Sequence, residues 1–212
     1  MDLKQAVLHK TRHGLLATTV HYGFVALRKV TPCEILRVFV ADGTPVGDGQ
    51  VSGYVTRELT LEEAHGHSIT LPRTPDFAAA IKRGDRCFVN IFERRVVGHT
   101  FTSPQAIPIH PGLSLGIPPE FDYSYGSYTA PEHRGKRLTL ARSDSRKIAN
   151  QKNGLHRPLA WYVAVDNYGS LAALARIVGA RVVGHLAYIG IGNRYLARSS
   201  TACQNLGFSL KT

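Results

Sequence analysis

The chain has 212 residues, 43% of them hydrophobic, and three widely spaced cysteines, so it can bury an ordinary core but is not a disulfide scaffold. No apolar run approaches the roughly 20 residues of a membrane-spanning helix, and no signal-peptide pattern opens the chain, so we expect a cytoplasmic protein without membrane insertion. The formal net charge of +11 is one-sided: residues 1–133 hold 13 Lys/Arg against 13 Asp/Glu, whereas residues 134–212 hold 13 Lys/Arg against Asp144 and Asp166 alone.

The first half of the chain predicts short strands and two short helices. Residues 3–20 are compatible with a helix or an irregular arm, and the β-branched, aromatic runs at 23–30 and 34–41 predict strands. Thr60 with Glu63 three residues later is a capping-box pattern, and Thr74–Pro75 with Gly84 brackets a second helix. Further expectations are a Gly-rich loop at 42–53, strands at 86–93 and 94–103 joined by a turn at 93–95, and a Pro-rich loop at 104–119.

The second half predicts strands and helices in alternation. In "FDYSYGSYT", residues 121–129, alternation predicts a strand with Phe121, Tyr123, Tyr125, Ser127 and Thr129 on one face. A helix should start at Arg134 and bury Leu138, Ala141, Ser145 and Ile148. We expect next a buried strand at 159–166, a helix capped by Asn167 and ended by Gly179, and a closing hairpin around 190–193.

The basic stretch after this strand is a candidate anion site. A helix start presents unpaired N–H groups and the positive end of the helix dipole. Gly135 permits close approach of a ligand to the backbone, and Arg134, Lys136 and Arg137 add charge that suits phosphate oxygens. The cationic excess of the chain begins at the same residue, Arg134, which favours an anionic partner there.

Two segments, "YTAPEHRGKRL" and "VDNYGSLAALARIVGAR", together resemble the donor-binding motifs of the GNAT (Gcn5-related N-acetyltransferase) superfamily. In that family a strand ends in P-E-x-R-G-x-G-x-G/A and opens the helix that holds the coenzyme A pyrophosphate. A later N-x-x-S segment packs against the pantetheine arm. Here Arg134 and Gly135 are kept, while Arg137 and Thr139 stand where the pattern has glycine or alanine.

The order of the elements predicts an α+β or mixed α/β fold, and the resemblance implies a mixed, mostly antiparallel central sheet with helices on both faces. Residues 1–54 would form an arm and first strands of the same domain, and residues 55–212 the acyltransferase core. The implied activity is transfer of an acyl group from acyl-CoA or acetyl-CoA to a small-molecule or peptide amine, with no metal. The residues expected to bind the donor are Ser127, Tyr128, Thr129, His133, Arg134, Gly135, Lys136, Arg137, Leu138, Thr139, Asn167 and Ser170.

The chemistry requires a stabilised oxyanion and a base for the amine. The resemblance implies that the strands at 121–129 and 159–166 splay apart and expose backbone N–H groups near Ser127–Thr129 to the thioester. Candidate bases are Asp122, His99, Glu93 and His133, of which we favour Asp122 and His99, and Tyr125 is a candidate acid. Structural roles for His99 and the tyrosines stay open.

Two alternatives use the same basic region. The donor could be acyl carrier protein, because a cationic face suits a large acidic partner. The chain could instead be a non-enzymatic module that binds nucleic acid or an anionic surface. Against the second alternative, the aromatic residues occupy alternating strand positions and no nucleic-acid-binding motif is present.

Overall fold

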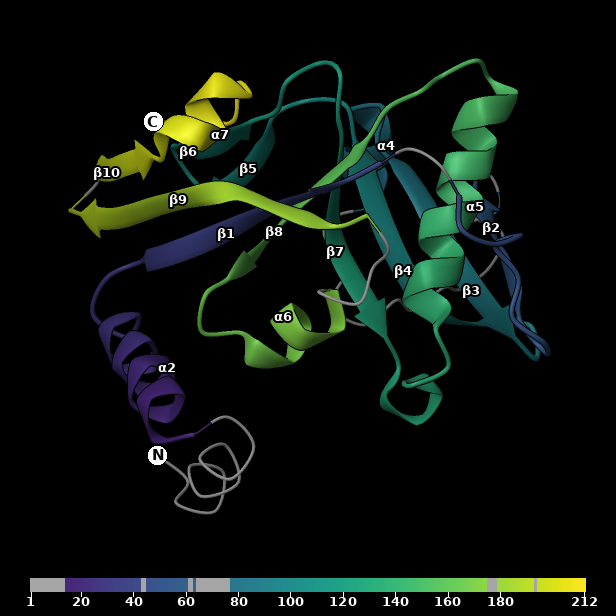
Figure 1. Ribbon diagram of the computed structural model, residues 1–212, viewed down its shortest axis with the longest axis horizontal. Helices are drawn as coiled ribbons and strands as arrows, with labels where there is room; N and C mark the ends of the chain where they lie inside the picture. Colours follow the sequence, from purple (N-terminus) through teal and green to yellow (C-terminus); the bar gives the residue numbers. More distant parts are fainter. Residues whose placement is uncertain (1–13, 43–44, 61–62, 64–76, 175–178, 193) are drawn as a thin grey trace. The chain divides into compact units, whose positions relative to one another are not determined.

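The computed structural model describes residues 14–42, 45–60, 63, 77–174, 179–192 and 194–212 (Figure 1). The chain divides into two compact units, which are described separately. The central unit is formed by residues 40–106 and 117–161, and the terminal unit by residues 1–39, 107–116 and 162–212. No helix in the described part of the chain is long and apolar enough to cross a membrane.

The central unit is built on a mixed sheet with the strand order β8-β7-β4-β3-β2. Antiparallel pairing joins β2 to β3, β3 to β4 and β4 to β7, while β7 and β8 are parallel. The β3–β4 turn places Glu93 and Arg94 at φ 46° and 62°, the left-handed pair that a two-residue hairpin requires, and this confirms the predicted turn. The strands are β2 (Val55–Leu59), β3 (Arg86–Phe92), β4 (Arg95–Ser103), β7 (Asp122–Thr129) and β8 (Leu159–Ala164).

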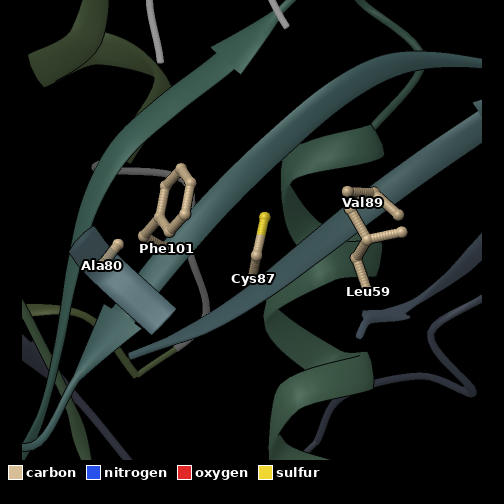
Figure 2. Packing of buried hydrophobic residues seen from close by; sticks show 5 residues of the cluster. All are labelled: Leu59, Ala80, Cys87, Val89 and Phe101. Carbon is tan, nitrogen blue, oxygen red and sulfur yellow. The ribbon is translucent and has the colours of Figure 1, made fainter. Parts of the chain in front are cut away.

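Helices cover both faces of this sheet. On one face, α4 (Phe77–Lys82) contributes Ala80 to a buried apolar cluster with side chains of β2, β3 and β4. Figure 2 shows the cluster, which consists of Leu59, Ala80, Cys87, Val89 and Phe101. On the other face lies α5 (Leu138–Lys152), whose Arg142 side chain donates hydrogen bonds to Asn90 of β3 and Thr100 of β4. The α+β fold with a mostly antiparallel sheet is therefore as predicted.

The terminal unit contains the strand order β10-β9-β1-β8 and a small sheet of order β11-β6-β5. The strands β1 and β8 each run from one unit into the other. The predicted closing hairpin is confirmed as β9 paired antiparallel with β10. The elements are α2 (Leu15–Leu27), β1 (Cys33–Ala41), β5 (Ile107–His110), β6 (Leu113–Gly116), α6 (Tyr168–Leu174), β9 (Arg181–Ile191), β10 (Arg194–Ser199), α7 (Thr201–Asn205) and β11 (Ser209–Lys211).

Two sequence predictions in the terminal unit are wrong. The strand expected at 23–30 lies largely within helix α2, because a short apolar run such as this one is compatible with a helix as well as with a strand. The Pro-rich stretch expected to be a loop holds the hairpin β5–β6. Pro108 is tolerated because β5 is an edge strand, whose outer side needs no ladder hydrogen bond.

Two capping signals are confirmed on described residues, whereas the helix expected after Thr60 lies outside them apart from Glu63. Thr60 and Glu63 form the reciprocal bonds of a capping box, from Thr60 N–H to Glu63 Oε2 at 3.0 Å and from Glu63 N–H to Thr60 Oγ1 at 3.3 Å. Gly84, at φ 86°, follows α4 as predicted, whereas Thr74 and Pro75 lie outside the described residues. Strand β2, which falls directly before the capping box, was not predicted.

Candidate functional site

The basic loop before α5 has an unusual backbone. A short 3-10 turn, Pro131–His133, is followed by extended Arg134, by Gly135 at φ 79° and by Arg137 at φ 59°. Helix α5 therefore begins at Leu138, and the prediction that it begins at Arg134 is wrong by four residues, because two left-handed positions cannot continue a right-handed helix. Arg137 adopts the left-handed conformation at a position where the GNAT pattern has glycine, so the backbone keeps a shape that glycine would favour.

The helix start is free to bind an anion. Arg137 makes no side-chain cap, and the first turn of α5 holds no acidic residue. By helix geometry the N–H groups of Leu138, Thr139 and Leu140 have no acceptor within the helix. The side chains of Arg134, Lys136 and Arg137 are all exposed around these groups, so the loop presents both N–H donors and charge.

A cluster of aromatic side chains, Tyr54, Phe92 and His133, packs against the loop and forms hydrogen bonds with it. The hydroxyl of Tyr54 lies 2.9 Å from His133 Nδ1, and Lys136 Nζ donates to the same hydroxyl at 2.8 Å. The ring of Phe92 contacts both Tyr54 and His133, and Leu138 is buried beneath them. Leu138 can therefore serve a ligand only through its N–H group. Tyr54 was missed from the sequence because it lies in no motif and about 80 residues before the loop.

Strand β7 carries a β-bulge at Gly126. The register changes from Phe101 opposite Tyr125 to His99 opposite Tyr128, which leaves one extra residue on β7, and Gly126 has φ 58°. The extra residue reverses the alternation. The prediction that Ser127 and Thr129 share a face with Tyr123 and Tyr125 is therefore wrong.

The bulge assigns the β7 side chains to two faces. Ser127 and Thr129 lie on the α5 face, where both accept hydrogen bonds from Arg142. Tyr125 lies on the α4 face against Phe101, and Tyr128 stacks on His99. On the other side of β7, pairing with β8 is limited to Asp122 with Leu159 and Tyr123 with Ala160. From Ser124 onward β7 therefore has no β8 partner in the register, and this edge of the strand is not paired with β8 near the bulge.

Asp122 lies in a buried ion-pair network beneath α5. Its Oδ2 atom accepts hydrogen bonds from Arg146 Nη1 and from Asn150 Nδ2, each at 2.7 Å. Arg157 lies 3.7 Å from Oδ1. All these contacts hold the carboxylate in place and balance the buried charge of Arg146, which is a structural task.

Tyr125 belongs to a second network, on the α4 face. Its hydroxyl donates to Asp85 Oδ2 at 2.6 Å, and Arg83 donates to both groups. Burial, reinforced by the hydrogen bond to Asp85, raises the pKa of the Tyr125 hydroxyl. A proton held in this way is harder to transfer to a departing thiolate.

His99 is a buried imidazole on β4. His99 is 0% exposed, and its ring nitrogens make no hydrogen bond of good geometry among the described residues, although the backbone of Gly126 lies close enough to act on the ring. Burial, helped by the charge of Arg142 and opposed by a contact with the Gly126 backbone, lowers its pKa to about 4. The ring is therefore neutral at pH 7 with a free lone pair, which is the state that a base requires.

The buried His99 should make stability depend on pH. The unfolded chain takes up a proton below a pKa of about 6.5, whereas the folded chain does so only near 4, so stability is full above pH 6.5 and falls toward pH 4. The loss should approach roughly 3 kcal/mol, and His99→Phe, which preserves the ring stacking, should abolish this part of the slope. Urea unfolding at pH 7 and pH 4.5 measures the loss of stability in the wild type and in His99→Phe. An equal loss in the two proteins would contradict the prediction.

Helix α5 buries charged residues, contrary to expectation. Leu138 and Ala141 are buried as predicted, but Ser145 and Ile148 are only half-buried. The other buried residues of the helix are polar or charged: Arg142, Asp144, Arg146, Lys147 and Asn150. Part of the cationic excess therefore lies inside the central unit, where it cannot act as a surface field. A period-3.6 search for apolar residues cannot find such a face.

The remaining two predicted donor residues belong to the terminal unit. Asn167 caps α6 as predicted, with its Oδ1 accepting from Ser170 N–H at 3.2 Å. The preceding Asp166 is held by Arg28 through two hydrogen bonds of 2.9 Å. Their participation in a site with the basic loop stays a prediction.

Comparison with known proteins identifies the fold. No family model and no curated protein sequence matches the chain. A GCN5-related N-acetyltransferase from Kribbella flavida is similar in structure, with TM-score 0.51 and 13% identity over 77% of this chain and 59% of that one. Another, from Sphaerobacter thermophilus, has TM-score 0.50 and 12% identity over 84% of this chain and 56% of that one.

The chain therefore has the fold of the GNAT superfamily, as the resemblance in sequence implied. It spans less than two thirds of the length of either of these structures.

Proposed function

We propose that the chain is an N-acyltransferase that takes its acyl group from acyl-CoA. The observation that carries the proposal is the loop Arg134–Arg137, whose two left-handed residues open an uncapped, positively charged helix start. The diphosphate of coenzyme A would bind the N–H groups of residues 138–140 and the exposed side chains of Arg134 and Arg137. The bulge at Gly126 lies on the strand leading into this loop, where the thioester would follow.

The reaction would be direct attack. The amine nitrogen forms a bond to the thioester carbon, the carbonyl electrons move to oxygen, and the C–S bond then breaks as the carbonyl re-forms. The amine loses one proton, and the thiolate gains one to leave as the thiol of coenzyme A. N–H groups of β7 near the bulge would stabilise the oxyanion. Of the proposed bases and acids, His99 has a free lone pair, whereas Asp122 and Tyr125 are engaged with Arg146 and Asp85.

The experiment is isothermal titration of the chain with coenzyme A and acetyl-CoA. We expect saturable binding of both at micromolar to low millimolar concentration, weakened by salt. No binding at millimolar donor would remove the proposal. The acceptor amine would then be sought by following release of free thiol from acetyl-CoA over a panel of small amines and peptides.

Substitutions at Arg137 test whether coenzyme A is bound mainly by the backbone of the loop or by its side chains. Arg137→Gly keeps the left-handed backbone and removes its strain, so the protein should gain about 1 kcal/mol in free energy of unfolding. If the cradle is mainly backbone, the affinity for coenzyme A should fall no more than about threefold, because only an exposed charge is lost. Arg137→Gln, which also loses the charge but keeps the strain, is the matched control. A tenfold or greater loss in both variants would mean that the guanidinium itself grips phosphate.

Acyl carrier protein is the competing donor. The exposed side chains of Arg134, Lys136 and Arg137 would suit its acidic surface equally well. Binding of an acylated carrier protein, but not of acetyl-CoA, would favour this donor. Salt-dependent binding of DNA or RNA without any thioester binding would instead favour a non-enzymatic module.

A further inference from the structure

Arg142 is a buried charge without a counter-ion. The residue is 1% exposed and lies one turn into α5, and burial lowers its pKa to about 10, so it stays protonated at pH 7. Within the described part of the chain it forms no ion pair, whereas Arg146, one turn further on, is paired with Asp122. All acceptors of its hydrogen bonds are neutral: Asn90 Oδ1, Thr100 Oγ1, Ser127 Oγ, Thr129 Oγ1 and Thr139 Oγ1.

Stability does not explain this arrangement. A guanidinium removed from water without a carboxylate partner carries a large desolvation cost, and an apolar side chain of similar volume often serves a core equally well or better. Asn90 is nevertheless oriented for Arg142, because its Nδ2 group donates to Thr56 at 2.9 Å and leaves Oδ1 toward the guanidinium. The chain has thus built a polar shell around one uncompensated positive charge.

The guanidinium sets the direction of two hydroxyl groups. Arginine only donates hydrogen bonds, so Ser127 Oγ and Thr129 Oγ1, each 3.3 Å from Nη2, must accept from it. Ser127 Oγ also lies 3.0 Å from Thr100 Oγ1, whose single proton has the His99 carbonyl oxygen, at 2.9 Å, as its other acceptor. The protons of Ser127 and Thr129 must therefore point away from Arg142. Among the described residues the Thr129 proton has no acceptor, and the Ser127 proton has Thr100 Oγ1 as its alternative to a ligand. Ser127 is exposed, next to Gly126 at the bulge.

We propose that Arg142 is a positioning residue, which holds the Ser127 and Thr129 hydroxyls as donors toward the thioester carbonyl oxygen of the bound acyl donor. The inference rests on the proposed function. Hydroxyls that accept from a cation are polarised and become stronger donors. The negative charge that develops on the carbonyl oxygen during attack supplies the missing counter-charge. The positive charge of Arg142 thus has no counter-ion in the free protein, and the negative charge on the carbonyl oxygen serves as one in the transition state.

The test uses acetyl-CoA labelled with carbon-13 at the carbonyl, so that no acceptor is needed. Hydrogen bonds to the carbonyl lower its stretching frequency and move its carbon-13 resonance downfield, and each should shift when the probe binds the wild-type chain. In Arg142→Met and in the double variant Ser127→Ala/Thr129→Val the probe should still bind, with the shift reduced to the part that the backbone N–H groups of β7 produce. Arg142→Lys should keep more of the shift. Adding Arg142→Met to the double variant should change nothing further, because all three act as one unit.

Thr102→Val is the matched control, since Thr102 is a buried hydroxyl on the same face of β4 outside the Arg142 shell. It should leave the shift unchanged. Thermal unfolding should show that Arg142→Met remains folded at the assay temperature, although Asn90 Oδ1 loses its donor. A full shift in Arg142→Met and in Ser127→Ala/Thr129→Val would overturn the role of Arg142 while leaving the proposed function intact. Absence of acetyl-CoA binding to the wild type would overturn both.

Discussion

Asp122→Ala should be among the most destabilising single substitutions in the central unit. It removes the carboxylate that binds Arg146 at 2.7 Å and leaves a guanidinium that is 1% exposed without a counter-ion. Breaking a buried ion pair by removing one partner costs about 3 to 5 kcal/mol. For a chain of this size the melting temperature should fall by roughly 6 to 20 °C. Thermal and urea unfolding measure the effect.

The double variant Asp122→Ala/Arg146→Met provides the control. It removes both charges together, so most of the lost stability should return. The same pair separates structure from catalysis, because a base at Asp122 would stay lost in the double variant while the fold recovered. Wild-type stability in Asp122→Ala, with loss of thioester turnover, would instead favour the catalytic role predicted from the sequence.

The sequence predicted the fold because its main signals are local. The strand segments that became β3 and β4, the capping box at Thr60 and Glu63, and the Asn167 cap each depend on residues within one element or its ends. Together with the P-E-x-R-G segment they were enough to imply the GNAT fold. Strand β2 was missed because its five residues lie against a loop and are too short for a clear period.

The errors at the candidate site come from single residues that change the phase of a pattern. Gly126 inserts one position into β7 and exchanges the faces of Ser127 and Thr129, although the preceding tyrosines follow the expected alternation. Gly135 and Arg137 postpone the start of α5 by four residues. Glycine permits a left-handed backbone without requiring it, and arginine gives no sign of it, so neither feature could be derived from composition.

The buried charges of α5 were hidden for a different reason. A hydropathy pattern assigns Arg142 and Arg146 of α5 to the solvent-exposed surface. Most of the residues that they bind lie on strands of the sheet, far away in the sequence. Asp122, Asn90, Thr100 and Ser127 are between 15 and 52 residues away in sequence from the arginines that they bind. Only tertiary structure brings such pairs together, and buried polar networks of this kind are the places where local reasoning fails.

The second large effect concerns the diphosphate of the donor. Reversing two charges in Arg134→Glu/Arg137→Glu should weaken binding of coenzyme A at least 100-fold, because losing the two exposed charges costs up to about threefold each and each new carboxylate about 4 Å from the phosphates adds roughly 1 kcal/mol or more of repulsion. Binding of pantetheine, which carries neither the diphosphate nor the nucleotide, should change little. Isothermal titration with both ligands gives the comparison.

Lys82→Glu/Lys152→Glu is the matched control for net charge. Both lysines are exposed in the central unit, and Lys152 lies at the far end of α5, about 21 Å along the helix from its start. A charge change there should weaken coenzyme A binding only slightly, because the Debye length at physiological salt is about 8 Å. An equal loss of coenzyme A affinity in both double variants would mean that the ligand responds only to overall charge. An equal loss of affinity for pantetheine and for coenzyme A would mean that the loop does not hold the diphosphate. If only Arg134→Glu/Arg137→Glu weakens binding, and only for coenzyme A, the diphosphate binds at the start of α5. The backbone there keeps the shape of a glycine motif, although the sequence has replaced part of that motif.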